Sequence, residues 1–157
     1  MEASSEKKEP TAAEIMTADA VTVHENAKVH EVAQLMSEHN ISGVPVVNDN
    51  HQVVGIVTEG DMVEMDADIH FPHYINFLDS VIFLESTRKF DKRVRHVFAS
   101  SVRDIMTTEV ETVQKETPLH EIATLMSDRK VNRLPVLDGD KLVGIVTRAD
   151  VVRAMAG

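Results

Sequence analysis

The sequence contains one unit twice, and this repeat constrains the fold more than any other feature. Residues 13–63 recur, nearly in step, at 102–152. The motif Ile-Met-Thr at 15–17 returns 90 positions later, and the segment Gly55–Asp61 returns 89 positions later, after one deletion. Two copies of a unit in one chain predict a pseudo-symmetric pair with two equivalent sites.

Each copy is short, and the size bears on how the copies must pack. A unit of roughly fifty residues buries too little apolar surface to be comfortably stable alone. We therefore expect the two copies to share one core. The chain is 43% hydrophobic and 27% charged, which is typical of a globular protein. No apolar run approaches the ~20 residues of a membrane-spanning helix, so no membrane insertion is expected.

Charge and cysteine content exclude several classes of function. The net charge of −10 opposes general binding to nucleic acid, whose affinity rests largely on Lys and Arg at phosphates. The absence of cysteine excludes disulfides, thiolate metal sites and a cysteine nucleophile. The start of the chain is charged and Ser-rich without an apolar signal segment, so residues 1–12 are expected to form a disordered tail of a cytoplasmic protein.

The pattern within each copy predicts the order β-α-β-β-α. In the first copy, strands are expected at 21–23, 41–47 and 53–57, with helices after a cap at Asn26 and from Thr58. In the second copy, Thr117 is the expected cap and Pro118 the first-turn proline. Strands are expected at 134–137 and 142–146, around a turn at 138–140.

These blocks resemble a known family. Ile-Met-Thr, a strand and helix, Val-Pro-Val-Val or Leu-Pro-Val-Leu, and Gly-Ile-Val-Thr-x-x-Asp are similar to the CBS domain, and two in tandem resemble a Bateman module. The resemblance implies an α/β (α+β) fold in which two repeats form a pseudo-twofold pair. It does not cover the segment between them, which we expect to be a helical insert. The boundaries expected are 13–63 for the first repeat, 64–101 for the insert and 102–157 for the second repeat.

Each copy ends in a Thr-x-x-Asp element that opens a helix. One interpretation is a capping box, in which the threonine caps the helix and the aspartate answers it. The other builds on the first, because a helix N-terminus suits a phosphate and a carboxylate can accept two hydrogen bonds from a ribose diol. The preceding glycines, Gly55 and Gly144, would let a ligand approach the backbone closely.

The resemblance implies roles for particular residues. It places Asp61 and Asp150 at ribose hydroxyls, and Thr58 and Thr147 near ribose or phosphate. It places adenine at the backbone of the Val-Pro and Leu-Pro segments and, more loosely, at four threonines of the first strands. These further positions are Val44, Pro45, Leu134, Pro135, Thr17, Thr22, Thr107 and Thr112. A purely structural pair that binds no ligand is the alternative.

The two copies differ in charge near this element. Arg133 and Arg148 stand where the first copy has Gly43 and Glu59. A guanidinium can clamp a phosphate, whereas a glutamate repels one. We therefore expect the site that carries Asp150 to bind a phosphorylated nucleotide better. Arg148 can also be a solvated helix residue, and each site can borrow residues from the other copy.

The insert holds every aromatic residue of the chain, five Phe and one Tyr between positions 71 and 98. Two helices are predicted there, one from Pro72 with an apolar face over 74–84 and a second with Phe90 and Phe98 on one side. They can extend the core or form an interface, because aromatic residues concentrated on one element favour association. The resemblance implies a homodimer.

No catalytic motif is visible, and the histidines His70 and His73 lack a third ligand, so neither an active site nor a metal site is expected. The favoured function is a regulatory module that needs no cofactor, binds an adenosyl ligand such as AMP, ADP, ATP or S-adenosylmethionine in clefts between the repeats, and signals to an effector protein. The alternatives are a ligand-free scaffold that acts through the insert, and an enzyme that uses histidine and carboxylate. The sequence leaves open which ligand binds, whether both sites are used and how the dimer is oriented.

Overall fold

The computed structural model describes residues 8–67, 74–77, 80–83 and 100–157. The chain forms two compact units, each assembled from separated parts of the sequence. Unit 1 consists of Met1–Val21, Asn50–Val53 and Val110–Gly157; unit 2 consists of Thr22–Asp49 and Val54–Glu109.

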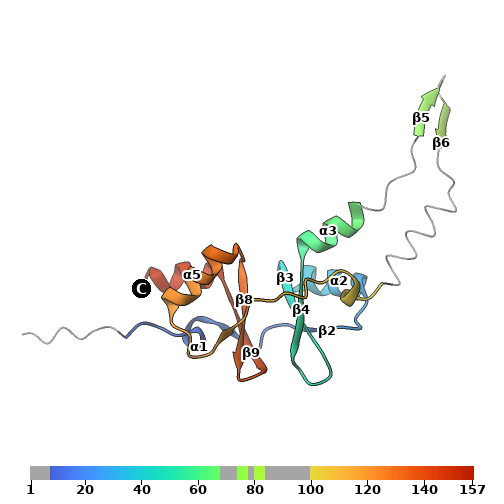
Figure 1. Ribbon diagram of the computed structural model, residues 1–157. Coiled ribbons are helices and arrows are strands. Elements are labelled where there is room, and N and C mark those ends of the chain that lie inside the picture. The colour runs from blue at the N-terminus through green and yellow to red at the C-terminus, as the bar shows by residue number, and fades with distance from the viewer. Residues whose placement is uncertain (1–7, 68–73, 78–79, 84–99) are drawn as a thin grey trace, which may run out of the picture. The chain divides into compact units, whose positions relative to one another are not determined.

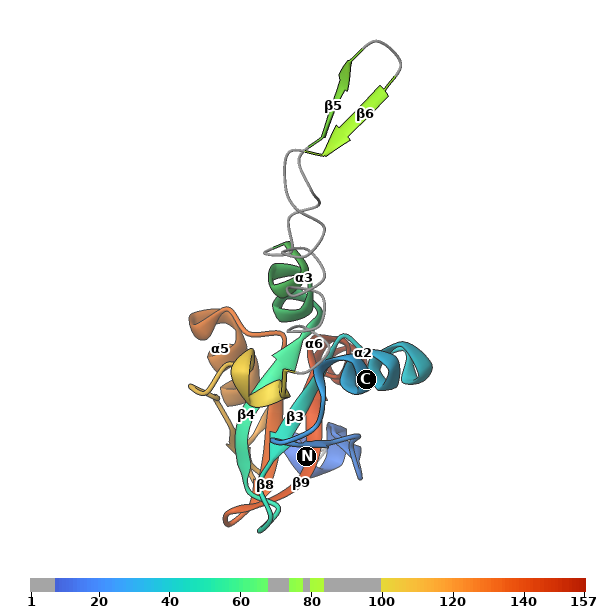
Figure 2. The ribbon, with the colours of Figure 1, turned by 90° about the vertical axis from the view of Figure 1, so that its right-hand side faces the viewer.

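Unit 1 is a four-stranded sheet with helices. The strands run in the order β1-β9-β8-β7, where β7 and β8 are parallel and the other neighbouring pairs are antiparallel. Figures 1 and 2 both show β8 and β9 side by side. The strands are β1 (Thr17–Ala18), β7 (Val113–Gln114), β8 (Arg133–Asp138) and β9 (Lys141–Thr147), and the helices are α1 (Ala12–Ile15), α5 (Leu119–Arg129) and α6 (Arg148–Met155).

The core of unit 1 forms where the sheet meets the helices. Alternate residues of β8, Leu134 and Val136, pack with Val146 of β9 because side chains on a strand point to opposite faces in turn. Ile122 and Met126 supply the apolar stripe of α5. All five side chains are almost completely buried, so the expected helical and strand periodicities are confirmed here.

Unit 2 repeats this arrangement with the first copy. Its three-stranded sheet has the order β2-β3-β4, and β2 and β3 are parallel. Val32 and Met36 of α2 are buried as Ile122 and Met126 are in α5. The elements are β2 (Val23–His24), α2 (Val29–His39), β3 (Gly43–Val47), β4 (Val53–Thr58), α3 (Glu59–Ala67) and the 3-10 helix η1 (Val102–Asp104). The mixed α/β fold with β-α-β-β-α repeats is therefore confirmed.

The segments that lead into the two copies are exchanged. The first leading segment, residues 12–18, contributes α1 and β1 to unit 1, where β1 pairs with β9 of the second copy. The second leading segment, residues 102–108, lies in unit 2, where Ile56 and Thr107 form a β-bridge with two backbone hydrogen bonds of 2.9 Å. Figure 1 shows the blue α1 beside the orange and red strands. Spatial units and sequence repeats thus differ at the start of each copy.

Both predicted helix caps are wrong by one or two residues. The N-cap of α2 is Lys28, two residues after Asn26, and the Lys28 N–H donates to Glu31 Oε2 at 3.4 Å. The N-cap of α5 is Pro118, because the hydroxyl of Thr117 instead accepts a bond from the Gln114 N–H at 3.1 Å and closes the preceding turn. Thr and Asn serve turns as readily as caps, which is why the sequence signal was ambiguous.

The helix predicted over 74–84 in the insert is also wrong. Tyr74–Phe77 and Ser80–Phe83 are the antiparallel strands β5 and β6, with Tyr74 paired to Phe83 and Phe77 to Ser80. Aromatic and β-branched residues make up most of both strands, and this composition favours a strand over a helix. The second predicted helix of the insert lies outside the described residues.

Over the described residues, the structure contains no helix long and apolar enough to cross a membrane.

Candidate ligand-binding site

The Thr-x-x-Asp elements form two equivalent strand–helix junctions. In unit 1, β9 ends at Thr147 and α6 begins with the next residue. The Thr147 N–H and hydroxyl donate to Asp150 Oδ2 at 2.8 and 3.0 Å, and the Asp150 N–H donates to Thr147 Oγ1 at 3.4 Å. In unit 2, the corresponding distances between Thr58 and Asp61 are 2.7, 3.0 and 3.4 Å. Both units therefore form a complete capping box, in which the threonine and the aspartate bond to each other's backbone N–H.

One carboxylate oxygen of each aspartate does all of this capping. Asp150 is buried to 7% exposure, and its other oxygen, Oδ1, accepts a bond from the Arg153 guanidinium at 3.1 Å. In unit 2, Glu64 occupies the position equivalent to Arg153. No contact of Asp61 Oδ1 occurs within the described part of the chain. Among the described residues, Asp61 Oδ1 therefore has no partner, whereas Asp150 Oδ1 is already bonded to Arg153.

In unit 1, the threonines and prolines implied by the resemblance lie in one row across the sheet. Thr17 pairs with Ile145, and Ile145 pairs with Pro135. Thr112 directly precedes Val113, which pairs with Val136, and so lies level with Pro135. The structure therefore brings Thr17 of the first leading segment to the second copy.

Unit 2 contains the equivalent row. Thr22 lies level with Pro45, because Val23 pairs with Val46. Thr107 bridges to Ile56 of β4, the strand beside β3. Each row therefore combines three strands of one copy with the leading segment of the other copy. The sequence alone left open whether a site borrows residues from the other copy in this way.

Each row lies close to the capped aspartate. Thr147 follows Ile145 by two residues, which is about 7 Å along a strand and on the same face. This face is opposite the core, because Leu134, Val136 and Val146 point to the other side. Arg133 pairs with Thr147 across the sheet and so stands beside the junction. A ligand with a ring at the row and polar groups at the junction would fit this spacing.

Exposure determines which atoms of the row can contact a ligand. Val44, Pro45, Leu134 and Pro135 have side chains that are almost completely buried. Contacts with a ligand would therefore come from their backbone, as the resemblance implies. Among the threonines, Thr17 and Thr107 are exposed, and Thr22 and Thr112 are half-buried.

The two glycines serve packing within the protein. A Cβ placed on Gly144 would lie 2.4 Å from Met16 Sδ and 2.7 Å from the Thr17 carbonyl oxygen. A Cβ on Gly55 would lie 2.4 Å from Met106 Sδ. The space that was predicted to admit a ligand is filled by the methionine of a leading segment. The sequence reasoning missed these methionines, although their recurrence 90 positions apart was a usable signal.

Arg148 lies on the surface at the start of α6. Its guanidinium donates to Asn132 Oδ1 at 3.1 Å, and its backbone N–H donates to the Asn132 carbonyl at 3.0 Å. The side chain is exposed and remains available to a charged partner. Asn132 and Arg153 were not singled out from the sequence, and only an alignment of the two copies reveals that Arg153 stands where the first copy has Glu64.

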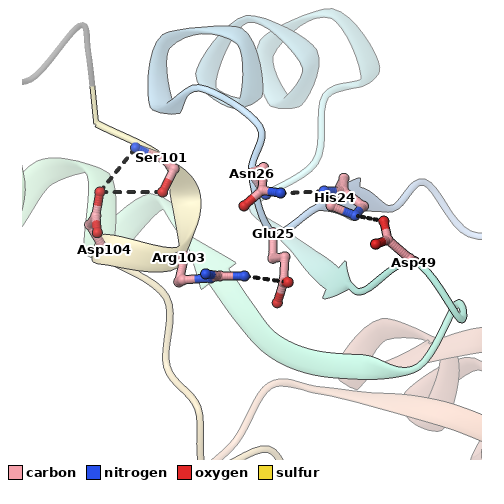
Figure 3. Close-up of polar contacts among 7 residues, drawn as sticks. All are labelled: His24, Glu25, Asn26, Asp49, Ser101, Arg103 and Asp104. Atoms are coloured by element: carbon pink, nitrogen blue, oxygen red, sulfur yellow. Dashed lines mark hydrogen bonds and ion pairs between the residues drawn. The ribbon is translucent and has the colours of Figure 1, made fainter.

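Polar contacts around η1 have a structural role. Arg103 contacts Glu25 and ties η1 to the turn after β2, and Asp104 caps η1 by accepting from the Ser101 N–H at 3.1 Å (Figure 3). His24 accepts from the Asn26 N–H at Nδ1, so its Nε2–H donates to Asp49 at 2.7 Å. The equivalent residues in unit 1, Gln114 and Gly139, exchange two hydrogen bonds of 3.0 and 3.1 Å. Because a glutamine makes the equivalent contact in unit 1, we interpret the His24–Asp49 contact as one that stabilises the turn.

Within the described ranges, no cluster of three or more His, Cys, Asp or Glu side chains could hold a metal ion. His70 and His73 lie outside those ranges.

The chain matches the family model "CBS domain" over residues 12–68 and 102–157. It is 33% identical to the chloroplastic CBS domain-containing protein CBSX2 of Arabidopsis thaliana over 84% of this chain and 57% of that protein. It is 29% identical to an uncharacterised protein of Methanocaldococcus jannaschii over 86% and 85% of the two chains. The chain thus spans little more than half the length of the plant relative.

Solved structures show the same fold. The crystal structure of CBSX2 in complex with AMP matches with a TM-score of 0.72 at 29% identity, covering 94% of this chain and 96% of that one. The CBS domain pair of protein MJ0100, in complex with 5'-methylthioadenosine and S-adenosyl-L-methionine, also matches with a TM-score of 0.72, at 25% identity over 95% and 98% of the two chains.

Proposed function

The chain belongs to the CBS domain family, and on that premise we propose that it is a regulatory module that binds an adenosyl ligand. The ligand would occupy the junctions that carry Asp61 and Asp150 together with the threonine rows beside them. Ligand binding would then bias the packing of the protein, because a ligand that prefers one state shifts the population toward it. The location of the ligand in clefts between the repeats is part of this proposal.

One observation carries the proposal: each unit places a capped aspartate, a strand row with two threonines and a Pro-containing strand at the same relative positions. A capping box alone would need only two of these residues. The similarity to structures solved with AMP, and with 5'-methylthioadenosine and S-adenosyl-L-methionine, supports an adenosyl compound as the ligand class. The ligand would be a regulator, and no further cofactor is proposed.

The remaining functional expectations are also part of the proposal. The chain would act without catalysis, associate as a homodimer and pass its signal to an effector protein. We propose the cytoplasm as its location, although the relatives from Arabidopsis thaliana are chloroplastic.

Thermal unfolding of the full chain against AMP, ATP, S-adenosylmethionine and 5'-methylthioadenosine tests the proposal, with GMP as a matched purine control. A ligand at a hundred times its dissociation constant adds ~2.7 kcal/mol, which raises the Tm by several degrees for a chain of this size. An adenosyl compound that raises the Tm where GMP does not supports the proposal. The absence of a shift with every compound contradicts it.

A second candidate function is a scaffold without a ligand. The closed geometry at both junctions favours it, because the capping bonds already satisfy one oxygen of each aspartate and Arg153 satisfies the other oxygen of Asp150. Such a scaffold would show no rise in Tm with any of these compounds and would still associate in solution.

A further inference from the structure

The leading segment of the first copy is fastened to unit 1 at both of its ends. We refer to residues 9–18 as the strap. At its start, the Glu9 carboxylate accepts a bond from the backbone N–H of His120 at 2.6 Å and one from the ring Nδ1 at 2.7 Å. At its other end, Thr17 pairs with Ile145 in the two-residue strand β1. The strap therefore connects the first turn of α5 to the row that contains Thr17.

Backbone bonds hold the middle of the strap against the loop that precedes α5. The Ala12 N–H donates to the Thr117 carbonyl at 2.8 Å, and the Ala13 N–H donates to the Lys115 carbonyl at 2.9 Å. The side chain of Ala12 is completely buried. A strand of two residues makes few bonds of its own, so the pairing of β1 with β9 depends on these bonds and on the contact at Glu9.

The two leading segments share these backbone bonds but differ in their side-chain contacts. At the position equivalent to Glu9, the sequence of the second copy has Ala99, which has no carboxylate. The second leading segment is held to the turn after β2 by Arg103, which contacts Glu25. In the strap, the position equivalent to Arg103 is Ala13. Each leading segment thus has a side-chain contact of its own, and a substitution can loosen one segment without changing the contact of the other.

We propose that the strap is a closing element of the unit 1 site, and that the contact between Glu9 and His120 sets how firmly it is closed. The strap supplies Thr17 to the row, so a ligand that contacts the row binds the closed strap and not the open one. Binding and closure are then coupled in both directions, because a ligand that prefers the closed state also stabilises it. Glu9 acts through the strap and is a positioning residue for Thr17. This regulation rests on the proposed function, which places the ligand at the row.

Hydrogen exchange of the full chain without ligand, measured by mass spectrometry of its peptides, tests the role of Glu9. Glu9→Ala should speed exchange in the strap about twofold to fivefold, because an exposed ion pair contributes little and the backbone bonds remain. Exchange over residues 102–108 should be unchanged. Arg103→Ala is the matched control and should speed exchange over 102–108 and leave the strap unchanged. Unchanged strap exchange in Glu9→Ala, or an equal effect on both leading segments, would overturn the proposal.

A second arm repeats the exchange with AMP at a hundred times the dissociation constant that calorimetry gives. AMP should slow exchange in the wild-type strap about tenfold or more, because the ligand binds only the closed state. AMP that binds and leaves strap exchange unchanged, or slows exchange only over 102–108, would overturn the coupling. No binding of AMP in calorimetry would contradict the proposed function and with it the coupling, whereas the exchange without ligand reports separately on whether Glu9 holds the strap.

Discussion

At the scale of single residues, the two junction aspartates differ in what their second carboxylate oxygen contacts. Asp61 and Asp150 cap their helices in the same way, yet Asp150 has an arginine partner and Asp61 has a glutamate at the equivalent position. The residue that follows the threonine is likewise Arg148 in one copy and Glu59 in the other. A phosphate should therefore be recognised at one junction and repelled at the other.

Arg148→Glu should weaken AMP binding about tenfold or more, because a charge-assisted bond to phosphate contributes ~1.5–3 kcal/mol and the new carboxylate repels the ligand. Titration calorimetry with AMP and with adenosine measures this. Adenosine has no phosphate, so its affinity should be unchanged. Arg129→Glu, which removes a basic residue paired with Glu111 elsewhere in unit 1, is the matched protein control. An equal loss of affinity for AMP and for adenosine would contradict the assignment of Arg148 to the phosphate.

The contact between Glu9 and His120 should make unit 1 sensitive to acid. Glu9 accepts bonds from the His120 ring at 2.7 Å and from the His120 backbone N–H at 2.6 Å, and these bonds lower the pKa of Glu9 below its ordinary value of 4.5. Because the folded pKa is the lower one, the stabilisation is present above pH 4.5 and is lost as the pH falls through the folded pKa.

Glu9→Gln removes this titration while keeping a hydrogen-bonding side chain. The difference in Tm between wild type and variant should be largest near neutral pH and shrink as the pH falls below 4.5, the ordinary pKa of a glutamate. A difference that stays constant down to pH ~3 would show that Glu9 contributes no charge-dependent stability.

At the scale of elements, the leading segments hold each sheet together across the copies. Met16 and Thr17 lie against Gly144, and Met106 and Thr107 lie against Gly55, so a glycine in each strand is required by close approach. Overlap with a backbone oxygen cannot be relieved by moving a side chain. A glycine of this kind serves packing even where no ligand binds.

Gly144→Ala should destabilise the protein by about 1–3 kcal/mol, since the added methyl group forces β1 away from β9. Gly60→Ala is the matched control, because Gly60 lies in the first turn of α3 and a Cβ there meets only Thr58 Oγ1 at 3.5 Å, an ordinary van der Waals contact. That change should stabilise the protein by ~0.5–1 kcal/mol. Urea denaturation of both variants measures the difference. Equal effects of the two changes would contradict the packing role of Gly144.

Local pattern predicted most of the elements and failed where partners are distant in sequence. The apolar stripes of α2 and α5 and the hairpin of β8 and β9 follow from periodicity and turn residues. The exchange of leading segments does not, because residues 15–17 and 105–107 have the same sequence and each would fit either glycine. In the insert, an aromatic run satisfied a helical pattern although its composition favoured strands.

At the scale of the whole molecule, the repeat predicted two equivalent sites, and the structure contains two equivalent units. Each unit brings together site residues predicted from both copies, as Thr17 with Thr112 and Thr107 with Thr22. Residue identities predicted that Thr58 would meet Asp61 and that Thr147 would meet Asp150 at the junctions. The pairing that assembles the rows arises from contacts between distant segments, which single-sequence periodicity does not encode.

The central claim is that the capped aspartates bind an adenosyl ligand, and titration calorimetry of AMP with Asp61→Asn and Asp150→Asn tests it most directly. Asparagine retains an acceptor for the cap but loses the carboxylate that would hold the ribose diol. Asp104→Asn and Glu14→Gln are the matched controls, since these residues accept from the N–H of Ser101 and Thr11 at 3.1 and 2.7 Å in the capping boxes of η1 and α1, outside the two Thr-x-x-Asp elements.

The account predicts that the wild type and both controls bind AMP with the same affinity, and that Asp150→Asn weakens binding about tenfold or more, with Asp61→Asn affecting only a second binding event. Each of the four variants should lose a similar ~1 kcal/mol of stability through its altered cap. AMP affinity that is unchanged in both junction variants, or no AMP binding by the folded wild type, would contradict the claim and leave the junctions as caps alone.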